Sequence, residues 1–179
     1  MSKSQIIVFS GASGVGKSTV LKQVMAARPD LRFSVSATTR SPRAGEVDGV
    51  HYFFVTRERF QEMIAGGELL EHDEHFGNLY GTPVSQVTGG GKVVLDVEPN
   101  GAFNAKKANP DAKLIFIAPP SMEELERRLR SRGDTPEDQM EARIQRARWE
   151  IDQSPRYDHV VVNDDLDRCV REILDIIAE

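Results

Sequence analysis

Cysteine and long apolar runs are almost absent from this sequence. Its one cysteine, Cys169, cannot form an internal disulfide, and its neighbours Val170 and Ile173 predict a small apolar residue on one helix face. The apolar runs are about as long as a strand, which argues against a membrane-spanning helix. Because the first run follows Met1 almost directly, we expect no signal peptide. These features predict a cytoplasmic protein without a membrane partner.

Positive charge is also in short supply. The 179 residues include 28 Asp and Glu against 23 Lys and Arg, a net charge of -5. This balance argues against broad nucleic-acid binding, but it leaves room for a small anion held by local arginines. The four histidines lack the spacing of a metal-binding set (His51, His72, His75 and His159). With 39% hydrophobic and 28% charged residues, the chain is typical of a single globular domain.

Strand-like and helix-like segments alternate along most of the chain. Short apolar runs occupy residues 5–9, 32–37, 92–97, 113–118 and 159–162. Helical patterns cover residues 17–27, the segment opened by the capping box of Ser121 and Glu124, and the end of the chain from about Leu166. Another long helix runs through Glu150, with Thr135 as its expected cap and Pro136 in its first turn. This alternation predicts an α/β fold in which helices cover both faces of a mainly parallel sheet.

Two segments interrupt the alternation. Residues 41–82 are dense in glycine, aromatic and charged residues, with only a short helical patch at 58–65, and we interpret them as an inserted lobe. Residues 132–135 lie between two helical patterns and are flanked by arginines, which is typical of a lid hinge.

The glycine-rich segment after the first apolar run is the clearest functional motif. It has the pattern G-x-x-x-x-G-K-[ST], whose backbone N–H groups surround a phosphate while a helix N-terminus adds positive potential. We expect Lys17 to reach the β and γ phosphates of a nucleotide and Ser18 to help hold Mg²⁺. A phosphate loop alone does not separate ATPases, GTPases, kinases and scaffolds. The expected nucleotide-binding residues here are Gly11, Ala12, Ser13, Gly14, Val15, Gly16, Lys17, Ser18 and Thr19.

The apolar run at residues 92–97 carries acidic residues at its end. Asp96 is placed as expected of the acid that holds the Mg²⁺ shell in folds of this kind, and Glu98 follows two residues later. An alternative interpretation is that both acids only cap the end of a strand.

Over nearly its whole length the sequence also resembles the guanylate kinase family, a family of P-loop nucleoside monophosphate kinases. The resemblance rests on SVSATTRSPRAGEVDGVHYFF at residues 34–54, Glu71, GNLYGT at 77–82, IAPPS at 117–121, RG at 132–133 and VVNDD at 161–165. These motifs are long and ordered, and are therefore more specific than the phosphate loop.

The resemblance implies an enzyme that transfers the γ-phosphoryl group of ATP to GMP with Mg²⁺. It also implies a P-loop NTPase-type parallel sheet flanked by helices, with an inserted GMP-binding lobe and a short lid. In a single domain, we expect the core at about residues 1–40, 83–127 and 155–179, the lobe at about 41–82 and the lid at about 128–154.

At the positions where the guanylate kinase family binds GMP, this chain has side chains that can form the hydrogen bonds GMP needs. A carboxylate such as Glu71 can accept hydrogen bonds from both N1–H and N2–H of guanine, and the hydroxyl of Thr82 suits O6. Arginine forks suit the phosphate. The substrate-binding positions that the resemblance implies are Ser36, Arg40, Arg43, Tyr52, Glu71, Tyr80, Thr82, Asp96 and Glu98.

The remaining family positions lie on the ATP side. Arg132 and Arg143 match lid arginines, and Arg128 matches a neighbouring ATP contact. Asn163 and Asp164 match the loop that borders adenine, although a turn or helix cap explains them nearly as well. The residues assigned to catalysis are Lys17, Arg43, Arg132 and Arg143. A charged, solvated helix face describes the other arginines of this region (Arg127, Arg130, Arg146 and Arg148).

Two features depart from the family pattern. The family usually shows acid-x-Asp-x-Gln-Gly where this chain has DVEPNG at residues 96–101, so that Glu98 is longer and Asn100 is shorter than expected. The segment at residues 81–92 is about one helical turn shorter than the same segment in family members, and it contains three consecutive glycines.

Two other functions were weighed. Guanylate-kinase-like scaffold domains, which bind phosphorylated peptides, typically lose the phosphate loop that is intact here. A ribose bisphosphate kinase would lack the motif at residues 36–54.

Overall fold

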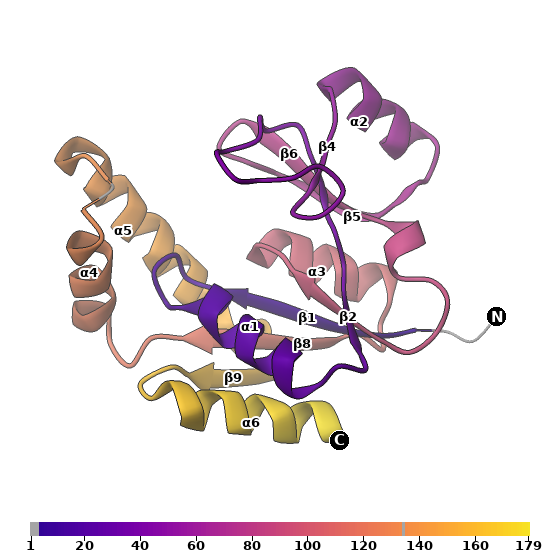
Figure 1. The fold of residues 1–179 in the computed structure, drawn as a ribbon. Coiled ribbons are helices and arrows are strands. Elements are labelled where there is room, and N and C mark those ends of the chain that lie inside the picture. Colours follow the sequence, from indigo (N-terminus) through magenta and orange to yellow (C-terminus); the bar gives the residue numbers. More distant parts are fainter. Residues whose placement is uncertain (1–3, 134) are drawn as a thin grey trace. The chain divides into compact units, whose positions relative to one another are not determined.

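The computed structural model describes residues 4–133 and 135–179 as an α/β fold (Figure 1). A parallel five-stranded sheet has the order β2-β7-β1-β8-β9. This sheet confirms the predicted fold class. Its strands are β1 (Gln5–Gly11), β2 (Leu31–Phe33), β7 (Lys92–Asp96), β8 (Lys113–Ala118) and β9 (His159–Val162).

The described residues form two compact units. The first unit contains residues 4–8 and 30–113, and the second contains residues 9–29, 114–133 and 135–179. Strands β1 and β8 are buried along nearly their whole length, including Ile7, Phe9 and Phe116. Such continuous apolar burial is what a parallel strand covered on both faces requires.

A separate four-stranded mixed sheet belongs to the first unit. Its order is β4-β3-β6-β5, formed by β3 (Ala37–Thr38), β4 (Phe53–Phe54), β5 (Leu69–His75) and β6 (Asn78–Pro83). Helix α2 (Arg57–Ala65) buries Phe60 and Met63 in a core shared with Leu79. The unit also contains the 3₁₀ turn η1 (Val84–Gln86) and helix α3 (Pro99–Ala108).

The second unit is mainly helical. Helices α1 (Lys17–Ala27) and α6 (Leu166–Ala178) pack against each other, and α6 also contacts β9 (Figure 1). Cys169 is fully buried on the apolar stripe of α6, as predicted, and burial raises the pKa of its thiol to about 11. The other elements are α4 (Met122–Ser131), α5 (Glu137–Asp152) and the 3₁₀ turn η2 (Ser154–Arg156).

Two local predictions were wrong. The expected strand at residues 32–37 is two strands in different sheets, because Ser34 N–H still bonds to Val94 of β7 while the carbonyl of Ser36 accepts from Phe53. Thr135 does not cap α5, since Pro136 occupies the cap position and the Thr135 hydroxyl accepts a hydrogen bond from Arg143 instead.

Among the described residues, no helix is both long enough and apolar enough to cross a membrane.

Candidate active site

The phosphate loop connects β1 to α1 in the second unit, which is the context that its motif requires. Gly14 and Gly16 have φ angles of 86° and 89°, in the left-handed region. A side chain at either position would also collide with a neighbour: a Cβ on Gly16 would lie 2.9 Å from Nδ2 of Asn163, and one on Gly14 would lie 2.8 Å from Leu129. Glycine is therefore required twice, by backbone conformation and by packing.

Helix α1 begins at Lys17, with Gly16 at its cap position and no side chain capping it. The first N–H groups of a helix have no partner within the helix, and the helix dipole makes this end positive. Lys17, Ser18 and Thr19 lie in the first turn of α1, at this positive end, and their contact with a nucleotide phosphate stays a prediction.

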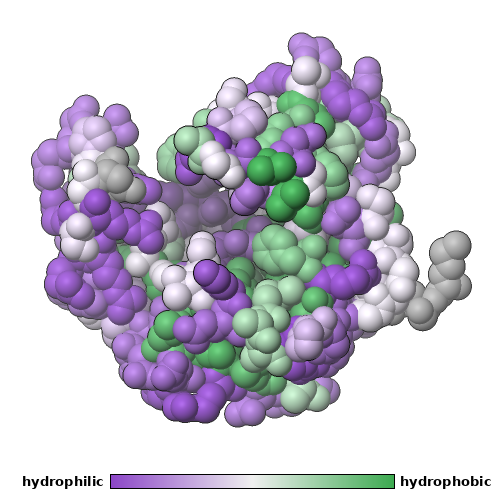
Figure 2. Space-filling view, in the orientation of Figure 1, coloured by the Kyte–Doolittle hydropathy of each residue, from purple (hydrophilic) through white to green (hydrophobic). Residues whose placement is uncertain are grey.

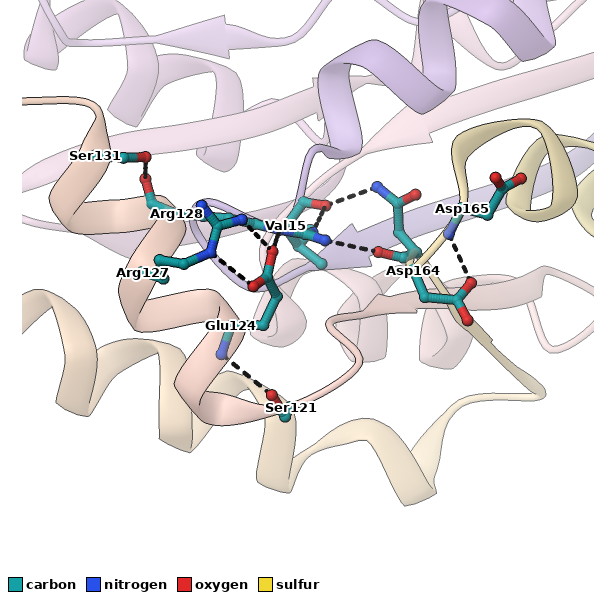
Figure 3. A network of polar contacts seen from close by, with 9 residues as sticks. Val15, Ser121, Glu124, Arg127, Arg128, Ser131, Asp164 and Asp165 are labelled. Atoms are coloured by element: carbon teal, nitrogen blue, oxygen red, sulfur yellow. Dashed lines mark hydrogen bonds and ion pairs between the residues drawn. The ribbon is translucent and has the colours of Figure 1, made fainter.

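Two predicted ATP-side residues hold the loop itself in this structure (Figure 3). The carbonyl of Val15 accepts from Nδ2 of Asn163 at 2.9 Å and from Arg128 at 3.4 Å. Arg128 also donates to the carbonyl of Asn163 at 3.2 Å, and Glu124 orients its guanidinium through an ion pair of 2.9 Å. Contact of Arg128 and Asn163 with ATP stays a prediction.

Asp164 makes local contacts near the start of α6. Its carboxylate accepts from the amide of Asp165 and pairs with Arg168, while Asp165 caps the helix by accepting from the amide of Arg168. In this structure Asp164 therefore has the turn interactions that its sequence context also allowed, and its contact with adenine stays a prediction.

The two arginines that the sequence predicts for a lid lie at the end of α4 and on α5, and their role as lid residues stays a prediction. Arg132 follows the end of α4 and is exposed, and Arg143 lies on α5, where it bonds to Thr135. The predicted charged helix face is confirmed for the three exposed arginines, which pair with Glu124, Glu137 and Glu126 respectively (Arg127, Arg130 and Arg148). Figure 2 shows that the surface over α4 and α5 is mostly hydrophilic.

The same prediction was wrong for Arg146. This residue is half-buried, pairs with the buried Glu150 at 3.1 Å, and its guanidinium lies 4.3 Å from the ring centroid of Trp149. Glu150 in turn accepts a hydrogen bond of 3.2 Å from the amide of Ser13 in the phosphate loop. Sequence reasoning passed over Glu150, because one acid in a charged helix carries no signal of its own.

The predicted guanine-reading pair lies in the first unit. Glu71 of β5 and Thr82 of β6 are opposite each other in register, and both are buried. The hydroxyl of Thr82 donates to Oε1 of Glu71 at 2.6 Å, and Oε2 lies close to Gly101, where an added Cβ would come within 2.8 Å. Since a hydroxyl has one proton, Thr82 cannot donate to a guanine O6 while it donates to Glu71.

Burial changes the acidity of Glu71. Only 5% of the residue is exposed, and this desolvation raises the pKa of its carboxyl to about 7. The charge of Asp73, two residues further along β5, raises the same pKa, whereas the hydrogen bond from Thr82 opposes the shift. Asp73 was not among the predicted residues, although the two-residue period of a strand places it on the same face as Glu71.

Arg40, predicted to bind the GMP phosphate, is held by an acid and an aromatic ring. Its guanidinium forms two bonds, of 3.0 and 2.9 Å, to Glu46, and lies 5.2 Å from the ring centroid of Tyr52. Tyr52 and Tyr80 are in edge contact, with centroids 6.1 Å apart. Glu46 also accepts from the amide of Arg43 at 2.7 Å.

Glu46 is a third residue that the sequence prediction missed, after Glu150 and Asp73. The hydrogen bonds from the Arg40 side chain and the Arg43 amide hold the pKa of its carboxyl at about 2, so it stays ionised. The sequence offered one indication of this role, because Glu46 follows Arg40 and Arg43 closely and a carboxylate can orient an arginine side chain by pairing with it. Of the other predicted residues, Ser36 is half-buried and Arg43 is exposed.

Asp96 and Glu98 flank the end of β7. Asp96 is the last residue of the strand, and Glu98 occupies the cap position of α3 without making a side-chain cap bond. Each has one fully buried carboxylate oxygen. In the described part of the chain, no group of three or more His, Cys, Asp or Glu is arranged to hold a metal by itself.

A glycine loop between a buried strand and a helix, on a parallel sheet, defines the class of P-loop nucleotide-binding proteins. The profile of the guanylate kinase family matches residues 3–179. The chain therefore belongs to the guanylate kinase family, has the activity of a nucleotide-binding transferase of that family, and has GMP and ATP as the substrates this implies.

Individual relatives agree with the family match. The chain is 45% identical over 175 residues to a guanylate kinase of Synechococcus sp. strain JA-3-3Ab, which covers 96% of this chain and 81% of the relative. It is 45% identical over 181 residues to a guanylate kinase of Synechocystis sp. strain PCC 6803, which covers 99% and 95% respectively. These matches favour guanylate kinase over the two alternatives, a scaffold domain and a ribose bisphosphate kinase.

Solved structures place the fold in the same family. A crystal structure of guanylate kinase from Anaplasma phagocytophilum is 35% identical, with a TM-score of 0.78, and covers 99% of this chain and 86% of the other. A shikimate kinase from Bacteroides thetaiotaomicron has a TM-score of 0.54 at 15% identity and shares the fold alone.

Proposed function

We propose that GMP binds in the first unit, with its guanine against Glu71 and its phosphate near Arg40. The observation that carries this proposal is the buried Glu71 beside Thr82, because a buried carboxylate is costly unless it has a ligand or partner to bind. The ionised carboxylate keeps acceptor sites beyond the one that Thr82 uses. Those sites suit the N1–H and N2–H donors of guanine.

Adenine should be rejected at this carboxylate. It presents an acceptor at N1, where guanine presents a donor, and would place lone pairs against the buried oxygens of Glu71. To donate to the guanine O6, Thr82 must turn its hydroxyl away from Glu71 once the base supplies new donors.

Phosphate binding rests on a guanidinium held in advance. Glu46 orients Arg40, and the stacked Tyr52 limits its motion. Pre-orientation lowers the entropy lost when the phosphate binds. Further donors to the GMP phosphate would come from the neighbouring predicted positions (Ser36, Arg43 and Tyr80).

ATP is assigned to the phosphate loop of the second unit. Backbone amides at the start of α1 and the amine of Lys17 would hold the β and γ phosphates. Arg132 and Arg143 would stabilise charge on the transferring phosphoryl group, with Arg43 acting on the GMP side. Such arginines act by position and charge, and they do not need to exchange protons.

Two residues remain our candidates for Mg²⁺, Ser18 in the first turn of α1 and Asp96 at the end of β7. Hydroxyl and carboxylate oxygens are the ligands that this ion prefers. When bound, Mg²⁺ would neutralise charge on the β and γ phosphates. A contact of Glu98 with guanine or with Mg²⁺-bound water, and a cytoplasmic location, also remain predictions.

A coupled assay tests the proposal directly. GMP, AMP, UMP and a phosphorylated peptide are offered separately with ATP and Mg²⁺, and only GMP should be turned over efficiently. The Lys17→Ala variant should stay folded, because it alters a surface loop, and should lose transfer. Turnover by a folded Lys17→Ala protein at the wild-type rate would contradict the assignment of the loop.

A further inference from the structure

Helix α5 contributes a buried carboxylate, that of Glu150, which contacts the backbone of the phosphate loop. Glu150 has 2% of its surface exposed, and its Oε2 accepts from the amide of Ser13 at 3.2 Å. Ser13 directly precedes Gly14, one of the two loop residues with a left-handed backbone. The bond joins residues 137 positions apart and ties the first half of the loop to α5.

This carboxylate has a charged partner on its own helix. Arg146 donates from Nε to Oε1 of Glu150 at 3.1 Å, one helical turn away, and lies over the ring of Trp149. The two oxygens of Glu150 therefore have different partners, the loop amide on one and the guanidinium on the other. Trp149 fixes the guanidinium in place by a cation–π contact.

The pairing matters because the loop binds a polyanion. A buried carboxylate beside it would repel the phosphates of ATP if its charge were not compensated, and charge interactions are strong where water is excluded. Arg146 supplies this compensation. The carboxylate can then serve as an acceptor for Ser13 without opposing the ligand.

We infer that Glu150 is a positioning residue for ATP binding and that Arg146 neutralises it. Glu150 holds the Ser13 amide away from the phosphates and so sets the path of the loop into Gly14 and Gly16. It acts on ATP through the loop and has no role in binding GMP. The inference rests on the proposed binding of ATP by this loop.

The acceptor role is tested by a pair of substitutions at one position. In Glu150→Gln the amide oxygen can still accept from Ser13 while the NH₂ group faces Arg146. The lost Arg146 bond lowers stability and leaves the Ser13 bond in place, so the KM for ATP should stay within about threefold of wild type. In Glu150→Ala the Ser13 amide loses its partner, and the KM for ATP should rise about tenfold while the KM for GMP changes less than about twofold. Glu141→Ala is the matched control, since Glu141 is an exposed acid on the same helix.

The charge role is tested by removing the cation. Arg146→Met keeps an apolar chain over Trp149 but leaves Glu150 charged and unpaired by Arg146, so the KM for ATP should rise about tenfold. Adding Glu150→Gln to Arg146→Met removes that charge and should restore the KM for ATP to within about threefold of wild type.

A structural role alone predicts a different pattern. Equal effects on ATP and GMP, or a double variant no better than Arg146→Met, would overturn the inference. GMP-induced thermal stabilisation reports whether each variant is folded. If Lys17→Ala abolishes transfer while every Glu150 and Arg146 variant behaves as wild type, the inference fails and the proposed function stands; if Lys17→Ala is normal, the proposed function fails first.

Discussion

Glu71 is the side chain on which base choice should depend. Converting it to Gln preserves size but places an amide donor against a guanine N–H group, at a residue that is only 5% exposed. Leaving such a group unpaired costs about 2 to 4 kcal/mol, so kcat/KM for GMP should fall by roughly 30-fold to 1000-fold with little change in the KM for ATP.

Glu74→Gln is the control for that experiment. Glu74 lies on the same strand but is exposed on the opposite face, so its substitution should leave both substrates unaffected. An equal loss for GMP and ATP in Glu71→Gln would indicate a general defect, and unchanged GMP kinetics would remove Glu71 as the guanine reader.

The raised pKa of Glu71 predicts that GMP binding depends on pH. The pKa is about 7 in the free protein, and guanine needs the ionised carboxylate as acceptor. GMP affinity, measured by calorimetry, should therefore be constant above pH 8 and about tenfold weaker at pH 6, because protons compete with the base. The same shift makes folding favour the protonated carboxyl, so its contribution to stability falls as pH rises from about 4.5 to 7.

The phosphate of GMP also titrates, with a second pKa of about 6. Glu71→Gln removes the carboxyl and shows this remaining dependence alone. If wild type and Glu71→Gln had the same pH profile, the assignment of the transition to Glu71 would be wrong.

At the level of secondary-structure elements, the start of α1 is constrained both by backbone conformation and by packing. Gly16→Ala puts a Cβ 2.9 Å from Nδ2 of Asn163 at a φ of 89°. The collision would displace the side chain that holds the Val15 carbonyl, so ATP affinity should fall by at least about tenfold. An ATP analogue that cannot be cleaved measures this loss directly.

Gly67→Ala provides the comparison for backbone strain alone. Gly67 has a φ of 66° and nothing within 4 Å of its added Cβ. Alanine there should cost about 1 to 2 kcal/mol of stability through its left-handed backbone and leave ATP affinity unchanged. Equal effects of the two alanines on ATP binding would refute the loop argument.

For the whole chain, the two substrates should stabilise the fold separately, because the proposed ligands of GMP and those of the ATP phosphates lie in different units. At about 100 times its Kd, either nucleotide should add about 2.7 kcal/mol of stability and raise the Tm by roughly 5 to 10 °C. Calorimetric melting curves with GMP alone and with ATP and Mg²⁺ measure these shifts.

Chelation of Mg²⁺ then separates binding from transfer. EDTA should abolish transfer and reduce the shift caused by ATP, while the shift caused by GMP persists. Transfer that continues in EDTA would contradict the proposed requirement for Mg²⁺.

Much of the fold and part of the site follow from local sequence. The buried runs of β1 and β8 predict the parallel sheet, because they need cover on both faces wherever they pack. The phosphate loop was likewise predictable, since its glycines and Lys17 are contiguous and their backbone conformation depends mainly on one another. The apolar face of α6 with Cys169 is a third case, set by the helical period.

Contacts between distant residues depend on the assembled fold. The bond from Thr82 to Glu71 requires the register of β5 and β6, and the raised pKa of Glu71 requires its burial. Strand register and burial arise from packing of the whole unit, which a single sequence window does not contain. Long-range packing also divides the apolar run at residues 32–37 into β2 and β3, which belong to different sheets. It likewise brings Glu150 into contact with Ser13, 137 residues away in the sequence. The sequence alone therefore indicated which side chains are candidates for the chemistry. The tertiary structure decided which of them share a hydrogen bond, because those contacts form only when distant segments come together.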